Sequence, residues 1–278
     1  MRGKFDERYA VRLPSDVLRF PPVSLYEKEI EIKTEYAYVK IENPLNITAW
    51  RCLLALLRYG EVQRRDPTLG IRLSIDTYTL LGFMKTTDWT DLPATLKLLT
   101  ECRYNIRYEK RRGGFVVAGH FEVESGGKTS VVFTAEFMRF LEEYASLWFY
   151  YAFAFFLRKP SSINLHAFLT ANSKANRMKL PTALERARIN TDKLSKAKRY
   201  LQSALDELVE VGFLRGYSLE GDEVVFDRCS EQEIRARAIE LQKRIDEEIK
   251  AFIERFRRSV RESQRGRRQK QKIDKTLG

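Results

Sequence analysis

Residues 180–227 constrain the fold of this 278-residue chain more than any other stretch. A short helical segment over 182–188 leads into a polar turn at 190–192. A longer helix follows, in which apolar residues recur at helical spacing from Leu194 to Val211, so we expect one buried stripe that includes both. Two alternating strands around a glycine-containing turn then fill 214–227. The stretch therefore predicts a short helix, a turn, a long helix and a hairpin.

This order of elements is that of a winged helix-turn-helix. A helical pattern around 163–169 and a short strand at 178–180 precede the stretch and complete the motif. Residues 47–123 show the same order, with helix, strand, helix, turn, helix, strand, basic turn and strand. The sequence thus predicts an α+β fold that consists of two tandem winged-helix domains.

The predicted organisation has four parts. Residues 1–43 form an N-terminal strand and irregular segment, 44–141 the first winged-helix domain, and 142–228 the second. Residues 229–278 begin with an amphipathic helix, and the tail after Arg261 is so polar that we expect disorder. The apolar run 144–157 has fourteen residues, which is short of the roughly 20 that cross a bilayer. We interpret this run as a buried helix and expect no membrane association.

Positive charge is concentrated in two places. The formal net charge is +12, and residues 170–200 carry nine positive against two negative side chains. Residues 255–278 carry ten against two. Such bands favour a polyanionic partner, with double-stranded DNA ahead of an anionic membrane. A solvated basic helix face is the alternative interpretation of the first band.

The long helix offers its basic first turns to DNA, because a reading helix meets base edges near its N-terminus. Lys and Arg there can donate to guanine O6 and N7, while neighbouring cations hold phosphates. The residues that we expect at the interface are Lys174, Arg177, Lys179, Arg186, Arg188, Lys193, Ser195, Lys196 and Arg199, together with Lys85, Arg111 and Arg112 in the first domain.

Catalytic and metal-binding patterns are weak in this sequence. His120 and His166 are its only histidines, and each fits a packing or surface position better than a ligand position. Gly126-Gly127-Lys128-Thr129 lacks the first glycine of a phosphate loop and fits a hairpin turn. The three cysteines have no CxxC spacing, which favours a reducing, cytoplasmic compartment. We expect no enzyme activity, no cofactor and no metal.

The order of several segments resembles that of the Rep initiators of iteron-containing plasmids, over roughly residues 41–227. The segments are AWRCLLALL, LSIDTYTLLG, DLPATLKLL, the Arg-Arg-Gly-Gly turn, FTAEFMRFL and KLSKAKRYLQSALDELVEVGFL. The long helix and basic tail after Asp227 and the N-terminal strand segment depart from the family's pattern.

The resemblance implies a protein that binds origin repeats, opens the adjacent duplex and recruits the host initiator and the replicative helicase. It assigns base reading to Lys193, Lys196 and Arg199, and backbone contact to Arg186, Arg188, Arg111 and Arg112. It also implies a switch between homodimers and origin-binding monomers, and a location at the nucleoid or plasmid. A transcriptional regulator, a relaxase or primase, and a scaffold that binds only protein remain as alternatives.

Overall fold

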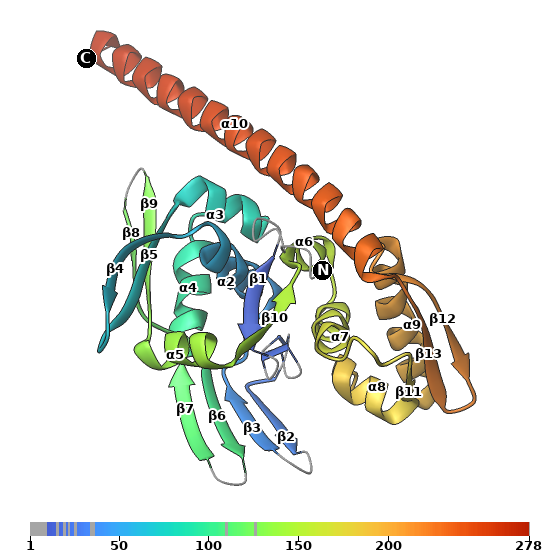
Figure 1. Cartoon of the computed structure of the whole chain (residues 1–278). Coiled ribbons are helices and arrows are strands. Elements are labelled where there is room, and N and C mark those ends of the chain that lie inside the picture. The colour runs from blue at the N-terminus through green and yellow to red at the C-terminus, as the bar shows by residue number, and fades with distance from the viewer. Residues whose placement is uncertain are drawn as a thin grey trace.

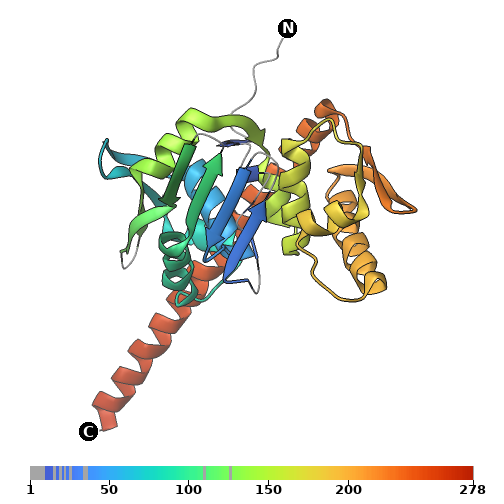
Figure 2. The same cartoon turned by 90° about the horizontal axis from the view of Figure 1, so that it is seen from below.

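Two groups of elements lie side by side in this computed structural model, and one long helix runs across both (Figure 1). Figure 2 shows the two groups from below. The structure describes residues 10–277 except 15–16, 19–20, 22, 25–26, 34–36, 109–110 and 125–126. We use "first unit" for the group that contains the predicted domain 44–141 and "second unit" for the group in 160–228. Helices and antiparallel sheets occur in both, so the fold class is α+β, as predicted.

The second unit has the strand order of a winged helix. Its elements are α7 (Pro160–Ala171), β11 (Arg177–Lys179), α8 (Leu180–Ala187), α9 (Leu194–Glu210), β12 (Leu214–Glu220) and β13 (Glu223–Arg228). The strands form an antiparallel sheet in the order β11-β13-β12, so the hairpin closes back onto the strand that precedes α8. The α9 stripe buries Ala197, Leu201, Ala204, Leu205 and Leu208 against this unit's other elements.

The first unit adds strands to the predicted element order, and it pairs its strands differently. Its elements are α2 (Ile47–Tyr59), β4 (Glu61–Asp66), β5 (Gly70–Asp76), α3 (Thr77–Met84), α4 (Asp91–Glu101), β6 (Arg103–Tyr108), β7 (Arg111–Val116), β8 (Ala118–Val123) and β9 (Lys128–Phe133). The hairpin β6–β7 extends a sheet begun by β2 (Glu29–Lys33) and β3 (Ala37–Glu42), in the order β2-β3-β6-β7. Strand β5 lies in a separate sheet, β4-β5-β9-β8. Strand β3, from the predicted N-terminal segment, therefore joins the first strand of its hairpin, β6, whereas β11 of the second unit joins the second strand of its hairpin, β13.

The junction between the units is partly a strand. The prediction of one helix over residues 144–157 is wrong there: α5 (Ala135–Tyr144) is followed by β10 (Ala145–Phe149) and the short α6 (Tyr151–Phe156). Strand β10 pairs with β1 (Val11–Pro14), a partner far away in sequence. Because aromatic residues favour strands when such a partner is present, tertiary pairing here overrides the helical pattern.

Helix α10 (Glu231–Leu277) connects the two units. It begins beside the second unit's hairpin, passes α6 and α3, and projects beyond the first unit (Figure 1). Its apolar stripe buries Ala238, Leu241, Ile245 and Ile249. Gly82 of α3 lets the helices approach, since a Cβ at this position would lie 3.3 Å from Ile249 Cγ1.

The expected disorder after Arg261 is wrong for the backbone, which is helical to Leu277. This tail contains no proline and is rich in Arg, Lys and Gln, which are good helix formers. Within the residues that the structure describes, no helix is both long and apolar enough to cross a membrane.

Candidate nucleic-acid interface

The first half of α9 presents an exposed basic face. Lys193, Ser195, Lys196 and Arg199 are all exposed, and the stripe centred on Leu201 occupies the opposite side of the helix. Lys196 Nζ and Arg199 Cζ lie 5.5 Å and 5.8 Å from the ring centre of Tyr200. These cation–π contacts restrict two long side chains without neutralising them. The predicted reading residues therefore come together on one accessible surface.

The first turn of α9 contains no acidic residue, and the nearest one in sequence is Asp192, just before the N-cap. Lys193 is the N-cap residue and its side chain makes no capping hydrogen bond, and the first turn lacks Asp and Glu. The positive end of the helix dipole thus adds to the charge of Lys193 and Lys196, which attracts anions. Leu194 differs from the prediction that it is buried: it is 59% exposed, because the apolar stripe extends one turn beyond the core that covers it.

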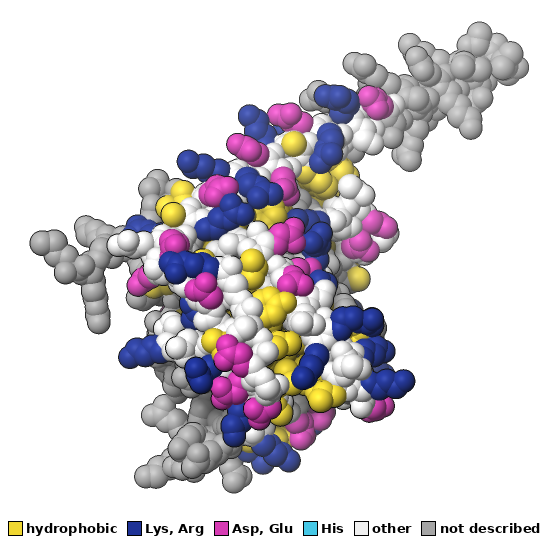
Figure 3. Space-filling model, turned by 90° about the vertical axis from the view of Figure 1, so that its right-hand side faces the viewer, with side chains coloured by type: hydrophobic (Ala, Val, Ile, Leu, Met, Phe, Trp, Pro, Cys, Tyr) yellow, Lys and Arg dark blue, Asp and Glu magenta, His cyan; other side chains and the backbone are white. Residues whose placement is uncertain are grey.

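The strand β11 and the loop before it extend the basic surface. Lys174, Arg177 and Lys179 are exposed, as expected. Arg177 Nη1 lies 3.3 Å from Glu223 Oε2 on the neighbouring strand β13, so its charge is partly compensated. Figure 3 views the molecule from the side of the second unit, where several Lys and Arg side chains gather toward the lower right.

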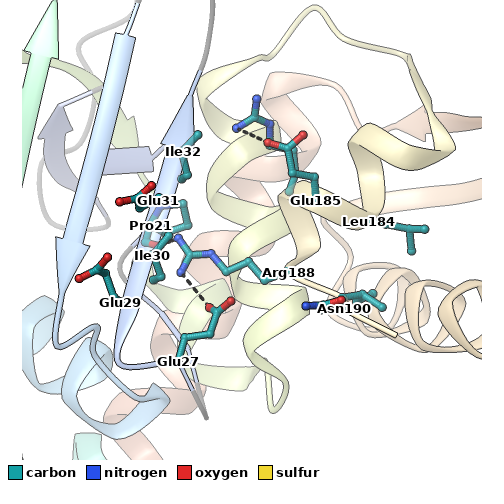
Figure 4. A pocket seen from close by; sticks show the side chains of 12 residues that line it. Pro21, Glu27, Glu29, Ile30, Glu31, Ile32, Leu184, Glu185, Arg188 and Asn190 are labelled. Carbon is teal, nitrogen blue, oxygen red and sulfur yellow. Dashed lines mark hydrogen bonds and ion pairs between the residues drawn. The ribbon is translucent and has the colours of Figure 1, made fainter. Parts of the chain in front are cut away.

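Arg188 does not belong to this surface, contrary to the sequence-based expectation. Its side chain is 11% exposed and lies in a cleft of about 290 Å³ between β2 and α8 (Figure 4). The guanidinium donates hydrogen bonds to the carbonyl oxygens of Pro21 and Val23 and lies 3.9 Å from Glu27 Oε2. Burial lowers the pKa of Arg188 to about 10, so the residue stays charged at neutral pH. Its donors are directed to the chain's own backbone and are not available to a phosphate.

Arg186 is also less accessible than its sequence position suggests, and Lys85, 37% exposed, makes contacts within the protein. The Arg186 side chain is 15% exposed, and its Cζ lies 5.2 Å from the ring centre of Phe168. Lys85 follows α3 in the left-handed conformation, with φ of 57°, and its Nζ lies 4.1 Å from the Phe155 ring centre and 3.9 Å from Glu248 Oε2 of α10. Burial lowers the pKa of Lys85. Lys85 therefore contacts α10 through a partly exposed ion pair.

Arg111 and Arg112 begin strand β7, where they pair with Tyr108 and Arg107 across the β6–β7 hairpin. Their side chains lie outside the described residues. The backbone places both at the tip of the first unit's hairpin, as the sequence predicts, and their contact with DNA stays a prediction.

The second half of α9 holds the fold. Glu207 is 6% exposed, and its carboxylate accepts hydrogen bonds of 3.2 Å from the backbone N–H groups of Arg158 and Lys159, just before α7 begins. Lys159 Nζ lies 3.2 Å from the same carboxylate and donates to Ser203 O. Burial raises the pKa of Glu207, but these hydrogen bonds and charges outweigh it, so the pKa is lowered. An ionised Glu207 thus joins α9 to the start of α7.

The two histidines differ in exposure, and the thiol of Cys102 is buried. His166 is fully buried among Phe149, Phe153 and Phe213, and burial lowers its pKa to about 3, which keeps it neutral. His120 is exposed, 3.4 Å from Glu122. Burial raises the pKa of Cys102 to about 12, so its thiol is not activated. Among the described residues, no group of three His, Cys, Asp or Glu side chains could hold a metal ion.

The comparisons with known proteins add a distant structural likeness. No family model and no curated protein matches the chain. A solved structure, described as domains 2 and 3 of RctB, superposes with a TM-score of 0.47 at 12% sequence identity, covering 80% of this chain and all of that one. A likeness at this level does not establish a shared function. The interface is defined by the residues of this chain alone.

Proposed function

We propose that this chain binds double-stranded DNA in a sequence-specific manner, with α9 of the second unit as its reading helix. One observation carries the proposal: α9, the third helix of the winged-helix unit, presents Lys193, Lys196 and Arg199 on its exposed face. In such folds the N-terminal turns of this helix enter the major groove. Phosphate contacts supply most of the affinity, and hydrogen bonds to guanine supply the specificity.

We further propose, on the resemblance to the plasmid initiators, that the sites are repeats in a replication origin. The protein would bind several repeats, open the adjacent duplex and recruit the host initiator and helicase, without a catalytic step of its own. The connection through α10 supports a coordinated action of the two units, because α10 packs on α3 of the first unit and its Arg237 donates a hydrogen bond to Val211 O at the end of α9.

Substitution of the reading residues tests the first proposal. Lys196→Ala and Arg199→Ala should each reduce affinity for the specific duplex by about 1–3 kcal/mol, roughly a 5- to 150-fold increase in Kd. Lys97→Ala is the matched control, because Lys97 is 68% exposed on α4, the corresponding helix of the first unit. Fluorescence anisotropy with a selected duplex measures the effect. Unchanged affinity in both α9 variants would show that α9 is not the reading helix.

A footprint on replicon DNA tests the second proposal. An initiator should protect several tandem repeats beside an AT-rich segment. Protection of one or two promoter sites would instead indicate a transcriptional regulator that uses the same surface. A metal-dependent nick in supercoiled origin DNA would contradict the proposal that the protein has no catalytic step.

A further inference from the structure

A second cleft, of about 240 Å³, lies where both units meet α10. Residues from four segments line it: the turn after α3, the segment at the end of α6, the second half of α9, and α10. Its charged lining residues are Lys85, Arg158, Arg237, Arg244, Glu207 and Glu210. Positive side chains therefore outnumber carboxylates in a cleft that three parts of the fold share.

Both carboxylates and two of the cations are compensated within the protein. Glu207 accepts hydrogen bonds from backbone N–H groups, as described above, and Arg158 Nε lies 3.6 Å from it. Arg158 Nη2 lies 3.1 Å from Glu210 Oε2. Arg237 Nη1 lies 2.7 Å from Glu240 Oε2. The cations with the least compensation are therefore the two that remain, one from the first unit and one from α10.

These two cations, Lys85 and Arg244, lie against one aromatic ring. Lys85 Nζ is 5.2 Å and Arg244 Cζ is 4.6 Å from the ring centre of Phe156. Lys85 has a 3.9 Å contact with Glu248, and Arg244 forms no ion pair within the described part of the chain. Burial lowers the pKa of Lys85, and the positive charges of nearby arginines lower it further. An anion between the two cations would relieve this repulsion.

We propose that this cleft binds a small phosphate-bearing anion, with Lys85 and Arg244 as its main ligands. A guanidinium presents its N–H donors in a planar fork that matches a phosphate, and an ammonium adds three further donors. The ligand should be small, because pockets for drug-sized molecules have volumes of about 300–1,000 Å³. The bound anion would connect the first unit to α10 and stabilise that contact.

The site is separate from the proposed DNA surface and does not depend on it. The cleft borders the second half of α9 at Glu207 and Glu210, whereas the exposed cations Lys196 and Arg199 lie on the first half. A helix rises 1.5 Å per residue, so Lys196 lies about 21 Å along the axis from Glu210. An anion in the cleft would therefore leave the basic face of α9 free.

Isothermal titration calorimetry of the full-length protein with sodium pyrophosphate and with sodium phosphate, at constant ionic strength, tests the site. Wild-type protein should show one saturable site per chain. Arg244→Gln and Lys85→Met each remove a charged donor and should each weaken binding by about tenfold or more. Pyrophosphate should also raise the melting temperature of wild type more than that of Arg244→Gln, since a ligand that binds the folded state stabilises it.

Two control variants locate the binding. Lys243→Gln removes the same charge from the residue before Arg244, which is exposed on α10 and does not line the cleft. Lys196→Ala removes a cation from the basic face of α9. Both should bind pyrophosphate as tightly as wild type. Without the anion, Arg244→Gln should unfold at the wild-type temperature, because Arg244 is exposed.

Three results would overturn the anion site. Neither anion binds wild type, or Arg244→Gln and Lys85→Met both bind as tightly as wild type, or Lys196→Ala abolishes binding. If neither anion binds but Arg244→Gln lowers the slope of log DNA affinity against log salt, the phosphate at this cleft belongs to DNA and the small-anion site is wrong. Failure of the α9 variants to change DNA affinity would instead overturn the proposed function and leave the anion site unaffected.

Discussion

The two halves of α9 contain charges of opposite sign, which are exposed in the first half and paired within the protein in the second. In the first half, Lys193, Lys196 and Arg199 are exposed and have no acidic residue beside them in the first turn. In the second half, Glu207 is buried beneath Arg158 and Lys159. Asp206 accepts a 2.7 Å hydrogen bond from the Tyr217 hydroxyl. One helix thus offers charge to a partner at one end and uses charge to hold the second unit together at the other.

The difference shows that burial and hydrogen-bond partners decide whether a charged side chain is available to DNA. Its position in a basic or acidic run of the sequence does not decide this. Arg188 lies within the basic band of residues 170–200, yet its guanidinium binds backbone carbonyl groups inside the protein. Lys85 is likewise engaged by aromatic rings and Glu248. We therefore expect substitutions of the buried, paired charges of Glu207 and Arg188 to change stability, and substitutions of the exposed charges on α9 to change DNA affinity.

Glu207→Ala should give the largest loss of stability. It leaves two backbone N–H groups without their acceptor and removes the partner of Lys159, which we expect to cost about 2–4 kcal/mol in the free energy of unfolding. DNA affinity of the folded fraction should stay unchanged, because Glu207 lies on the far half of α9 from Lys196. Urea denaturation and duplex titration at low temperature measure the two quantities. A loss of affinity without a loss of stability would break the division between the two halves.

The same residue makes stability depend on pH. The pKa of Glu207 is lower in the folded state, so its contribution is present above the ordinary glutamate value of 4.5 and is lost as pH falls through the folded pKa. Wild-type protein should therefore lose more stability than Glu207→Gln when the pH is lowered from 7 to below the folded-state pKa of Glu207. Equal losses in the two proteins would contradict an ionised Glu207 in the folded state.

Arg188→Ala should cost less, about 1–2 kcal/mol, because relief of the buried charge offsets part of the lost hydrogen bonding. Lys179→Ala, at an exposed position of β11, is the matched control and should leave stability within about 0.5 kcal/mol of wild type. The prediction fails if Arg188→Ala instead weakens DNA binding at full stability, which would return Arg188 to the interface.

The winged helix of the second unit could be predicted because its signals are local. The apolar stripe from Ala197 to Leu208 and the alternating strands at 214–228 are periodic patterns that each element shows by itself. The two strands form a sheet with β11, which is close in sequence. The first unit's sheet could not be predicted in the same way. Its hairpin β6–β7 pairs with β3, which lies some 60 residues earlier, and alternation within a strand does not identify a distant partner.

The candidate site was predicted in part for a related reason. The exposed residues Lys193, Lys196 and Arg199 follow from helical periodicity alone. The burial of Arg188 depends on carbonyl groups at Pro21 and Val23, and no pattern around Arg188 points to them. The exposure of Leu194 depends on where α8 stops covering α9, which is a property of packing. Tyr200 could have been noticed, since an aromatic residue between cations on a polar helix face is a signal in itself.

Lys85→Met should have the smallest effect and makes the comparison sharpest. Lys85 was expected at the DNA, but its side chain, 37% exposed, lies against Phe155, Phe156 and Glu248. Partial burial lowers its pKa, so the charged form carries a desolvation penalty, and methionine removes that penalty along with the ion pair. Because methionine packs well on aromatic rings, the two effects should nearly cancel, leaving the free energy of unfolding within about 0.5 kcal/mol of wild type.

The salt dependence of DNA binding is the second measurement. In Lys85→Met, the slope of log affinity against log salt should equal that of wild type. In Lys196→Ala, the slope should be smaller by up to about 0.9 if Lys196 neutralises one phosphate. A reduced slope in Lys85→Met would place Lys85 at the DNA and would mean that α10 moves away from it on binding.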